Sequence, residues 1–301
     1  MTPWVYVIVS PVKDEEAYIR FTIESVIHQT LRPGLWLLVD DGSIDQTTKI
    51  IREYCAKYEW IRLLTLNRRG ERRFPAEIQA FNAGYELIEG EAFEFIVKLD
   101  CDLSFEPTYF ERLLDKFNED ETLGIASGIY LERHGQDWIP IKMPEYHTSG
   151  ASKVLKSKCF RDIGGFVAAR GWDTLDEIKA QIKGWKTRHF SDVNIYHLKK
   201  EGSGVGLLSV NSMHGEIYYL VGGSKLFFAL KAFHRIAVGR PPVIGGLMMI
   251  YGFLKALLQR RKLLVSAEEA TFYRRLLHQR IKRRLITVFG KGNPDTTPSS
   301  I

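Results

Sequence analysis

The stretch FIVKLDCDLSF at 95–105 constrains the fold of this chain more than any other. Its first five residues are apolar or β-forming except for Lys98, and Asp100 and Asp102 follow with one residue between them. Such a run predicts a buried parallel strand that delivers two carboxylates to the edge of a sheet, where open α/β sheets bind ligands. Two hard oxygen ligands suit a divalent cation that also holds phosphates. For this short motif alone, two ordinary solvated loop aspartates remain the alternative.

The pattern before this stretch alternates strands with helices. Apolar runs predict strands at 4–10, 35–39, 61–66 and 95–99, and helical spacing predicts helices at 14–27, through 50–54 and at 75–88. This alternation indicates a mostly parallel sheet with helices on both faces. The second strand also ends in an acidic pair, Asp40 and Asp41. After residue 102 the pattern predicts a helix at 107–118, a strand at 125–131 and an irregular polar segment at 134–143.

Several classes of protein are disfavoured by what the sequence lacks. Its three cysteines show no CxxC and no zinc-like spacing, which fits a reducing cytosolic interior and argues against disulfides or structural zinc. The first residues have no basic region and turn acidic at Asp14, so we expect a first strand there rather than a signal peptide. No GxGxxG follows that strand, and no GxxxxGK[ST] occurs.

The order of motifs resembles family 2 glycosyltransferases, the inverting family with the GT-A nucleotide-sugar fold. The matching segments cover about residues 4–195 and are SPVKDEEAYI, VDDGSIDQT, NRRGERRFPAEIQAFNAG, KLDCDL and, after GGF, GWDTLDEIKAQIKGW. The resemblance implies a Rossmann-like α/β fold and a metal-dependent, hexosyltransferase-type enzyme. It also implies a nucleoside diphosphate sugar, with UDP preferred, as donor and Mn²⁺ or Mg²⁺ as cofactor.

The resemblance also assigns roles to individual residues. The positions that correspond to nucleotide contacts are Pro11, Glu15, Asp40 (facing the base), Asp41, Arg69 and Asp100. Asp100 and Asp102 would hold the ribose and the cation that bridges the diphosphate. His197 is a further candidate metal ligand, and Lys199 and Lys200 are candidate diphosphate contacts. A solvated basic loop would present the last three residues equally well.

The resemblance places the catalytic base at Asp173. Many family members have Glu-Asp at this point, whereas here the preceding residue is Trp172. This departure leaves Asp176 and Glu177 open as alternative bases, and a helix N-cap remains the structural alternative for Asp173. The chemistry needs a base because the acceptor hydroxyl must lose its proton as it attacks, while a cation neutralises the diphosphate leaving group.

Basic residues cluster toward the C-terminal end. Residues 225–291 hold 15 Lys or Arg and two acids, a balance of +13 that leaves −7 for the rest of a chain of net charge +6. A basic segment on an acidic body predicts contact with an anionic membrane surface or with nucleic acid. Large apolar side chains interleave with these charges, so we expect no nucleic-acid partner.

The same segment predicts amphipathic helices. Its longest uncharged run, 241–254, is 14 residues, shorter than the roughly 20 that an apolar helix needs to cross a bilayer. We therefore expect helices that lie in the membrane interface, or that pack on the catalytic domain or form a homo-oligomer. The residues expected to contact lipid are Phe227, Phe228, Phe233, Met248, Met249, Tyr251 and Phe253.

These features predict three regions and a location. They are a GT-A catalytic domain at 1–215, a basic amphipathic helical membrane-associating region at 216–290 and a disordered tail at 291–301. The expected acceptor is a lipid-linked or polysaccharide glycan at the inner, cytoplasmic face of the cell membrane, where the protein would be peripheral. The alternative functions are a sugar-nucleotidyltransferase and a non-catalytic membrane-surface protein that binds nucleotide sugars.

Overall fold

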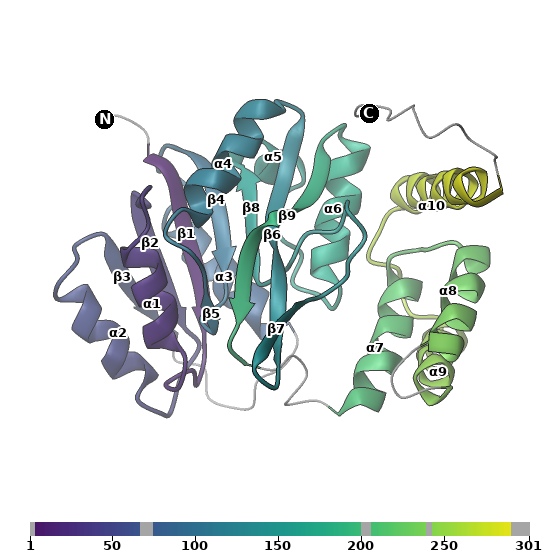
Figure 1. Cartoon of the computed structure of the whole chain (residues 1–301), viewed down its shortest axis with the longest axis horizontal. Helices are drawn as coiled ribbons and strands as arrows, with labels where there is room; N and C mark the ends of the chain where they lie inside the picture. Colours follow the sequence, from purple (N-terminus) through teal and green to yellow (C-terminus); the bar gives the residue numbers. More distant parts are fainter. Residues whose placement is uncertain (1–3, 67–74, 200–205, 239–242, 290–301) are drawn as a thin grey trace. The chain divides into compact units, whose positions relative to one another are not determined.

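The computed structural model describes residues 4–66, 75–199, 206–238 and 243–289 (Figure 1). The chain divides into two compact units, Met1–Ser203 and Gly204–Ile301, and each is described by itself. The division lies before helix α7 (Leu207–Leu220), whereas the sequence placed the boundary inside that helix, at 215. The tail predicted at 291–301 lies outside the described residues.

The first unit is built on a nine-stranded sheet in the order β3-β2-β1-β4-β8-β6-β9-β5, with β7 paired to β6. Strands β3, β2, β1 and β4 are mutually parallel, as the alternating pattern predicted, and β8 then pairs antiparallel with both β4 and β6. The strands are β1 (Trp4–Val12), β2 (Leu35–Asp40), β3 (Ile61–Thr65), β4 (Phe93–Leu99), β5 (Leu103–Ser104), β6 (Leu123–His134), β7 (Asp137–Pro140), β8 (Ser152–Lys156) and β9 (Lys186–His197).

Helices cover both faces of this sheet because strand side chains alternate between faces. On β1, Tyr6 and Ile8 belong to one apolar core, and Val7 and Val9 belong to the other. The first core includes residues of α1 (Ile19–Ile27), α2 (Thr47–Cys55) and α4 (Tyr109–Glu119). The second includes residues of α3 (Ala76–Glu86), α5 (Ser157–Asp162) and α6 (Trp172–Ile182). The helices on both faces confirm the predicted fold class.

Several strands were not predicted from the sequence, among them β7 and β8. Strand β7 lies in the segment predicted to be irregular and forms a hairpin with β6. Strand β8 carries Lys153, which is fully buried and lies directly opposite Lys98 of β4 in the antiparallel register. A lysine in the middle of a short run hides a buried strand from any hydropathy pattern, because burial of a charge depends on partners elsewhere in the chain.

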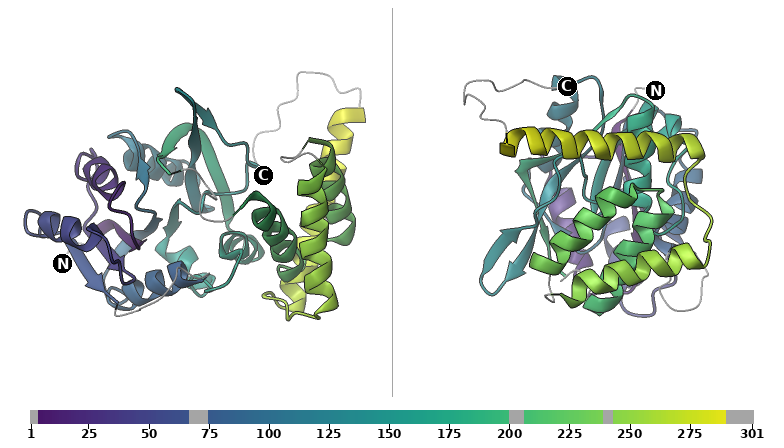
Figure 2. Two further views of the ribbon diagram at one scale, coloured as in Figure 1. Left: turned by 90° about the horizontal axis from the view of Figure 1, so that it is seen from below. Right: turned by 90° about the vertical axis from the view of Figure 1, so that its right-hand side faces the viewer.

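The second unit consists of α7, α8 (Lys225–Val238), α9 (Ile244–Leu258) and α10 (Ala267–Phe289) (Figure 2, green to yellow). Helices α7 and α9 pack with their backbones in contact. A Cβ at Gly215 would overlap the Met249 carbonyl oxygen, and one at Gly252 would overlap that of Ser212. Among the described residues, no helix combines the length and apolar character needed to cross a membrane.

Candidate active site

The carboxyl ends of β4 and β9 bring Asp102 and His197 together. The β5–β9 register places Leu103 opposite His197, and Leu198 N–H donates to the Asp102 carbonyl oxygen at 2.9 Å. These backbone contacts hold His197 Nε2 3.4 Å from Asp102 Oδ2, with each side chain only 13% exposed. The structure therefore brings together two residues that the sequence analysis named as candidate metal ligands.

This pair fits a divalent cation that takes its remaining ligands from elsewhere. Asp102 Oδ1 is buried and has no hydrogen-bond partner among the described residues. Burial alone would raise the pKa of Asp102, but the hydrogen bond and charge of His197 hold that pKa below its usual value, so the carboxylate stays ionised. In the described part of the chain, no three His, Cys, Asp or Glu side chains form a metal-binding group. Two protein ligands suit Mg²⁺ or Mn²⁺, which keep waters and bind substrate phosphates.

Asp100 has a different partner. Its Oδ1 lies 2.5 Å from Nζ of Lys98, a lysine that is 1% exposed and also pairs with Glu77 of α3. Asp100 N–H donates to the Ala151 carbonyl oxygen at 2.8 Å. The side chain remains 30% exposed, so it can still contact a ligand at the sheet edge. The structure thus places a buried cation, Lys98, beside Asp100, and the motif alone did not indicate it.

Glu15, predicted to contact the nucleotide, connects the loop after β1 to the end of β9. Its Oε1 lies 2.9 Å from Lys199 Nζ, and its backbone N–H donates to Thr47 Oγ1 at 2.8 Å. Glu15 is 3% exposed, whereas the Lys199 side chain is 31% exposed. Lys199 therefore presents a cation at the same edge as Asp102, where a diphosphate would need one. Pro11 of β1 is buried beneath this edge.

Asp40 shapes its own turn. Its Oδ1 accepts a hydrogen bond from Ser43 N–H at 2.9 Å and its Oδ2 accepts one from Thr48 Oγ1 at 2.5 Å. Asp41 is buried, and its carbonyl oxygen accepts a hydrogen bond from Lys13 Nζ at 3.1 Å. Both residues lie at the predicted edge, next to the end of β1. Contact of Asp40 with a base stays a prediction, whereas its role in the β2–α2 turn is visible. Arg69 and Lys200 lie outside the described residues.

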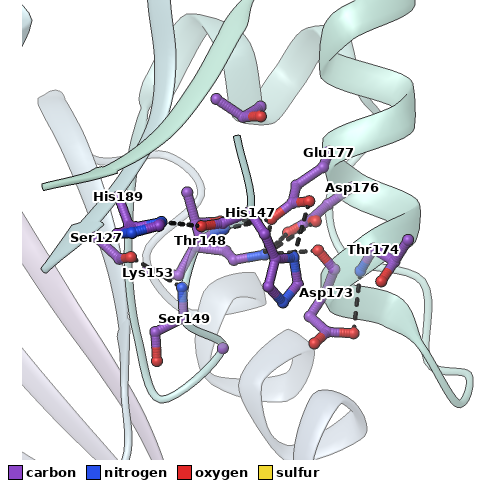
Figure 3. A network of polar contacts seen from close by, with 12 residues as sticks. Ser127, His147, Thr148, Ser149, Lys153, Asp173, Thr174, Asp176, Glu177 and His189 are labelled. Carbon is purple, nitrogen blue, oxygen red and sulfur yellow. Dashed lines mark hydrogen bonds and ion pairs between the residues drawn. The ribbon is translucent and has the colours of Figure 1, made fainter. Parts of the chain in front are cut away.

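The three carboxylates of α6 have different surroundings (Figure 3). Asp176 is 1% exposed, with its two oxygens 3.0 and 2.9 Å from Lys153 Nζ. Glu177 is 3% exposed and accepts hydrogen bonds from Thr148 N–H at 2.7 Å and Thr148 Oγ1 at 2.8 Å. Two of the three candidate bases are thus buried in contacts with other parts of the fold.

Asp173 is the accessible member of this group. It lies two residues after Gly171, the N-cap residue of α6. Gly171 has a φ of 77°, a conformation that favours glycine. Asp173 Oδ1 accepts a hydrogen bond from Thr174 N–H at 3.0 Å, and its side chain is partly exposed. The N-cap alternative is therefore wrong for Asp173, which lies inside the first turn. Its position favours it over Asp176 and Glu177 as the base.

Two buried lysines on neighbouring strands approach the ring system of Trp172. Lys98 Nζ is 5.2 Å and Lys153 Nζ is 5.1 Å from the centre of its ring system, which is within cation–π range. The Gly150 carbonyl oxygen accepts a hydrogen bond from Lys98 Nζ at 2.9 Å. A Cβ at Gly150 would lie 3.3 Å from the Trp172 ring and 3.6 Å from Asp173 Cβ. Contacts through Gly150 and Trp172 thus connect β4, which the acidic pair follows, with α6, which carries Asp173.

The sequence contained a signal that these two lysines are buried. Lys98 interrupts the otherwise apolar run IVKL at 96–99, and Lys153 directly precedes the apolar pair of SKVLK at 152–156. A buried lysine requires acidic partners, and acids are available within two residues of Lys98 and on α6. His147, whose Nδ1 lies 3.1 Å from Glu177 Oε2, gave no comparable signal in the sequence, since it lies in a segment without periodicity.

A family model and several known proteins match this chain. The family model described as Glycosyl transferase family 2 matches residues 7–170, which include β1 to β4 and the acidic pair. The chain belongs to glycosyl transferase family 2. This confirms the resemblance stated from the motifs.

Similar proteins come from bacteria and archaea. Chondroitin synthase of Escherichia coli is 31% identical over 106 residues, 35% of this chain and 14% of that protein. The chain matches 14% to 42% of the lengths of four curated relatives. Among solved structures, mannosyltransferase PcManGT of Pyrobaculum calidifontis, in complex with GDP-Man and Mn²⁺, has a TM-score of 0.54 at 15% identity, covering 95% of this chain and 81% of that one. S. aureus TarS with UDP-GlcNAc has a TM-score of 0.53 at 16% identity, covering 89% and 78%. At these identities the structures confirm the GT-A fold.

Proposed function

We propose that this protein is an inverting, metal-dependent glycosyltransferase. It transfers a hexose from a nucleoside diphosphate sugar, with UDP preferred, to a hydroxyl of a polysaccharide or lipid-linked acceptor. The observation that carries the proposal is the convergence of Glu15, Asp102, His197 and Lys199 at one sheet edge, with Asp173 on a separate element. Solved proteins of this fold bind GDP-Man with Mn²⁺ and UDP-GlcNAc, which supports the donor class and the cofactor.

Asp102 and His197 are the residues that would hold the cation. When bound, such a cation supplies charge neutralisation for the departing diphosphate. Lys199 lies 2.9 Å from Glu15 and is partly exposed, so its ammonium can meet the same phosphates. Asp100, oriented by Lys98, would contact the ribose. Each of these groups acts on the donor and none needs to change its protonation state.

Asp173 would act on the acceptor. Its carboxylate takes the hydroxyl proton while the acceptor oxygen forms a bond to the anomeric carbon. The bond from that carbon to the diphosphate oxygen breaks, and its electron pair leaves with the nucleoside diphosphate. A single displacement from the opposite face inverts the anomeric centre and requires no covalent nucleophile.

Two substitutions test these roles separately. Donors are screened as nucleoside diphosphate sugars with Mn²⁺ or Mg²⁺, by hydrolysis and by thermal stabilisation. Asp173→Asn should keep donor binding and lower turnover about 10²- to 10⁴-fold, the range for loss of a general base. Asp102→Asn should weaken the metal-dependent part of donor binding.

Asp115→Asn provides the matched control, because this residue is exposed on α4 and lies in none of the site's contacts. It should behave as the wild type. Normal turnover by Asp173→Asn would contradict the base assignment. Metal-dependent binding that Asp102→Asn leaves unchanged would contradict the metal assignment.

We also propose that the second unit binds the anionic inner surface of the cell membrane. Apolar side chains form an exposed stripe at helical spacing on α8 and another on α9. They are Leu226, Leu230 and Phe233 on α8, and Ile244, Leu247, Tyr251, Leu254 and Leu258 on α9. Exposed basic residues accompany them, including Lys225 and Lys255. An apolar stripe beside positive charge complements a surface of anionic lipid.

Three of the predicted lipid contacts were wrong. Phe228, Met249 and Phe253 are buried within the second unit, where Phe228 and Phe253 stack with ring centres 4.2 Å apart. They lie on the inner faces of their helices, and a sequence in which both faces are apolar does not show which face is inner. Phe233 and Tyr251 are exposed, as expected.

Vesicle sedimentation tests the membrane proposal. Full-length protein should sediment with vesicles that contain phosphatidylglycerol and much less with phosphatidylcholine alone. The triple variant Leu226→Ser, Leu230→Ser, Phe233→Ser should sediment less, whereas Leu87→Ser, which removes an exposed leucine of the first unit, should not. Equal sedimentation of the triple variant would contradict the proposal. A smaller oligomer in the triple variant would instead indicate that these stripes join copies of the chain.

A further inference from the structure

His147 is held against α6 by a buried carboxylate. Its Nδ1 lies 3.1 Å from Glu177 Oε2, and the same carboxylate accepts two hydrogen bonds from Thr148. The His147 carbonyl oxygen accepts a hydrogen bond from His189 Nδ1 at 2.9 Å. The backbone and one ring nitrogen are therefore fixed, while the side chain stays 26% exposed.

The other edge of the imidazole faces Asp173. Asp173 and Glu177 are four residues apart on α6, so their side chains lie on one face of the helix. In Figure 3 the His147 ring lies between the two carboxylates, with Nδ1 toward Glu177. The charge of Asp173 also contributes to the titration of His147. An exposed Nε2 beside the candidate base has no role in the donor chemistry described above.

Charges from several elements set the protonation of this ring. Burial and Lys153 of β8 lower the pKa of His147, whereas Glu177 and Asp173 of α6 raise it, and the pKa ends above its ordinary value. His189 of β9 contacts the His147 carbonyl oxygen rather than the ring. With both ring nitrogens protonated, Nδ1–H donates to Glu177 and Nε2–H remains available to donate.

We propose that His147, positioned by Glu177, forms the acceptor subsite together with Asp173 and selects acceptors that carry a second oxygen next to the reacting hydroxyl. This inference rests on the proposed function. Asp173 takes the proton of the attacking hydroxyl, and His147 Nε2–H donates to the neighbouring oxygen without changing its protonation. A vicinal diol of a sugar or polyol has this arrangement, whereas water and a simple alcohol lack it.

A titration of the histidine ring resonances by NMR tests the geometry without any substrate. The His147 signal is assigned by its loss in His147→Gln. Its pKa should fall in Glu177→Gln and also in Asp173→Asn, because each removes a neighbouring negative charge, and should not change in Asp115→Asn. An unchanged His147 pKa in Asp173→Asn would show that the two side chains do not face each other and would overturn the inference.

A matched pair of small acceptors tests the selection. With a donor that the enzyme hydrolyses, 1,2-propanediol and 1-propanol differ only in the neighbouring oxygen. We expect the wild type to prefer the diol in kcat/KM by about tenfold, the value of one hydrogen bond to a charged group. His147→Asn, whose amide reaches only the Nδ1 position, should lose this preference, whereas His147→Gln, whose amide reaches the Nε2 position, should retain part of it.

His28→Gln, which removes an exposed histidine beside Glu24, is the control. Hydrolysis without any diol preference in the wild type, or equal preference in His147→Asn, overturns the inference and leaves the proposed function standing. Absence of any turnover of nucleoside diphosphate sugars would overturn the proposed function, and the subsite would fall with it.

Discussion

The two units of this family 2 protein differ in what their cores contain. The first unit buries charged side chains in its sheet, with Lys98 and Lys153 both 0–1% exposed and each matched by acids. The second unit brings helix backbones together at Gly215 and Gly252 and leaves two apolar stripes outside. In the first unit, the buried lysines orient the acidic side chains that they contact. In the second unit, large apolar side chains remain exposed on α8 and α9. This difference matches the functions proposed for the two units, a reaction in the first and contact with a lipid surface in the second.

Lys153→Met should have the largest effect on stability. It leaves Asp176 buried without its cation, and breaking a buried pair by removing one partner costs about 3–5 kcal/mol. Chemical denaturation gives the free energy of unfolding, and hydrogen exchange should show the lost protection in the first unit. Lys158→Met, which removes an exposed lysine from its pair with Asp162, serves as the control. Equal stability of the two variants would show that buried charge does not distinguish the first unit.

Phe228→Ala and Phe233→Ala compare the inside and outside of one helix. Phe228 is 6% exposed and stacks on Phe253, so its truncation should cost about 3 kcal/mol. Phe233 is 74% exposed, and its truncation should change stability by no more than about 0.5 kcal/mol. Thermal unfolding of both variants measures the contrast. A large loss with Phe233→Ala would mean that the stripe is covered rather than exposed.

Gly252→Ala should lower stability by about 1–3 kcal/mol, the usual cost of forcing extra atoms into a packed contact. The added Cβ meets the Ser212 backbone of α7, which cannot rotate away as a side chain can. Gly206→Ala is the control in the same unit, since nothing lies within 4 Å of a Cβ there. Hydrogen exchange should localise the loss to α7 and α9. Similar stability of both variants would contradict the close approach of these helices.

The smallest effect concerns His147. Because its folded-state pKa is raised above 6.5 by Glu177, protonated His147 contributes stability that is present below pH 6.5 and is lost as the pH rises through the raised pKa. The stability difference between wild type and His147→Gln should therefore shrink as the pH rises above 6.5 and through the raised pKa. Denaturation at several pH values measures it. A difference that grows with pH would contradict the ion pair.

Much of the first unit could be predicted from its sequence. Strands β1 to β4 and their helices follow from local apolar periodicity, and the carboxylates at the ends of β2 and β4 follow from adjacency in the chain. Strand β8 could not be found this way, because Lys153 becomes compatible with burial only through Asp176, 23 residues away. The inner faces of α8 and α9 could not be found either, since both faces are apolar.

The sequence by itself determined the family, the fold class and the sheet edge at which the acidic residues gather, because those features depend on short-range order along the chain. Tertiary structure decided which acids remain accessible. The sequence left Asp176 and Glu177 open as alternatives to Asp173, yet partners at positions 147, 148 and 153 bury them. Burial and ion pairing depend on groups that are distant in sequence and close in space, so only the folded chain distinguishes a candidate base from a structural acid.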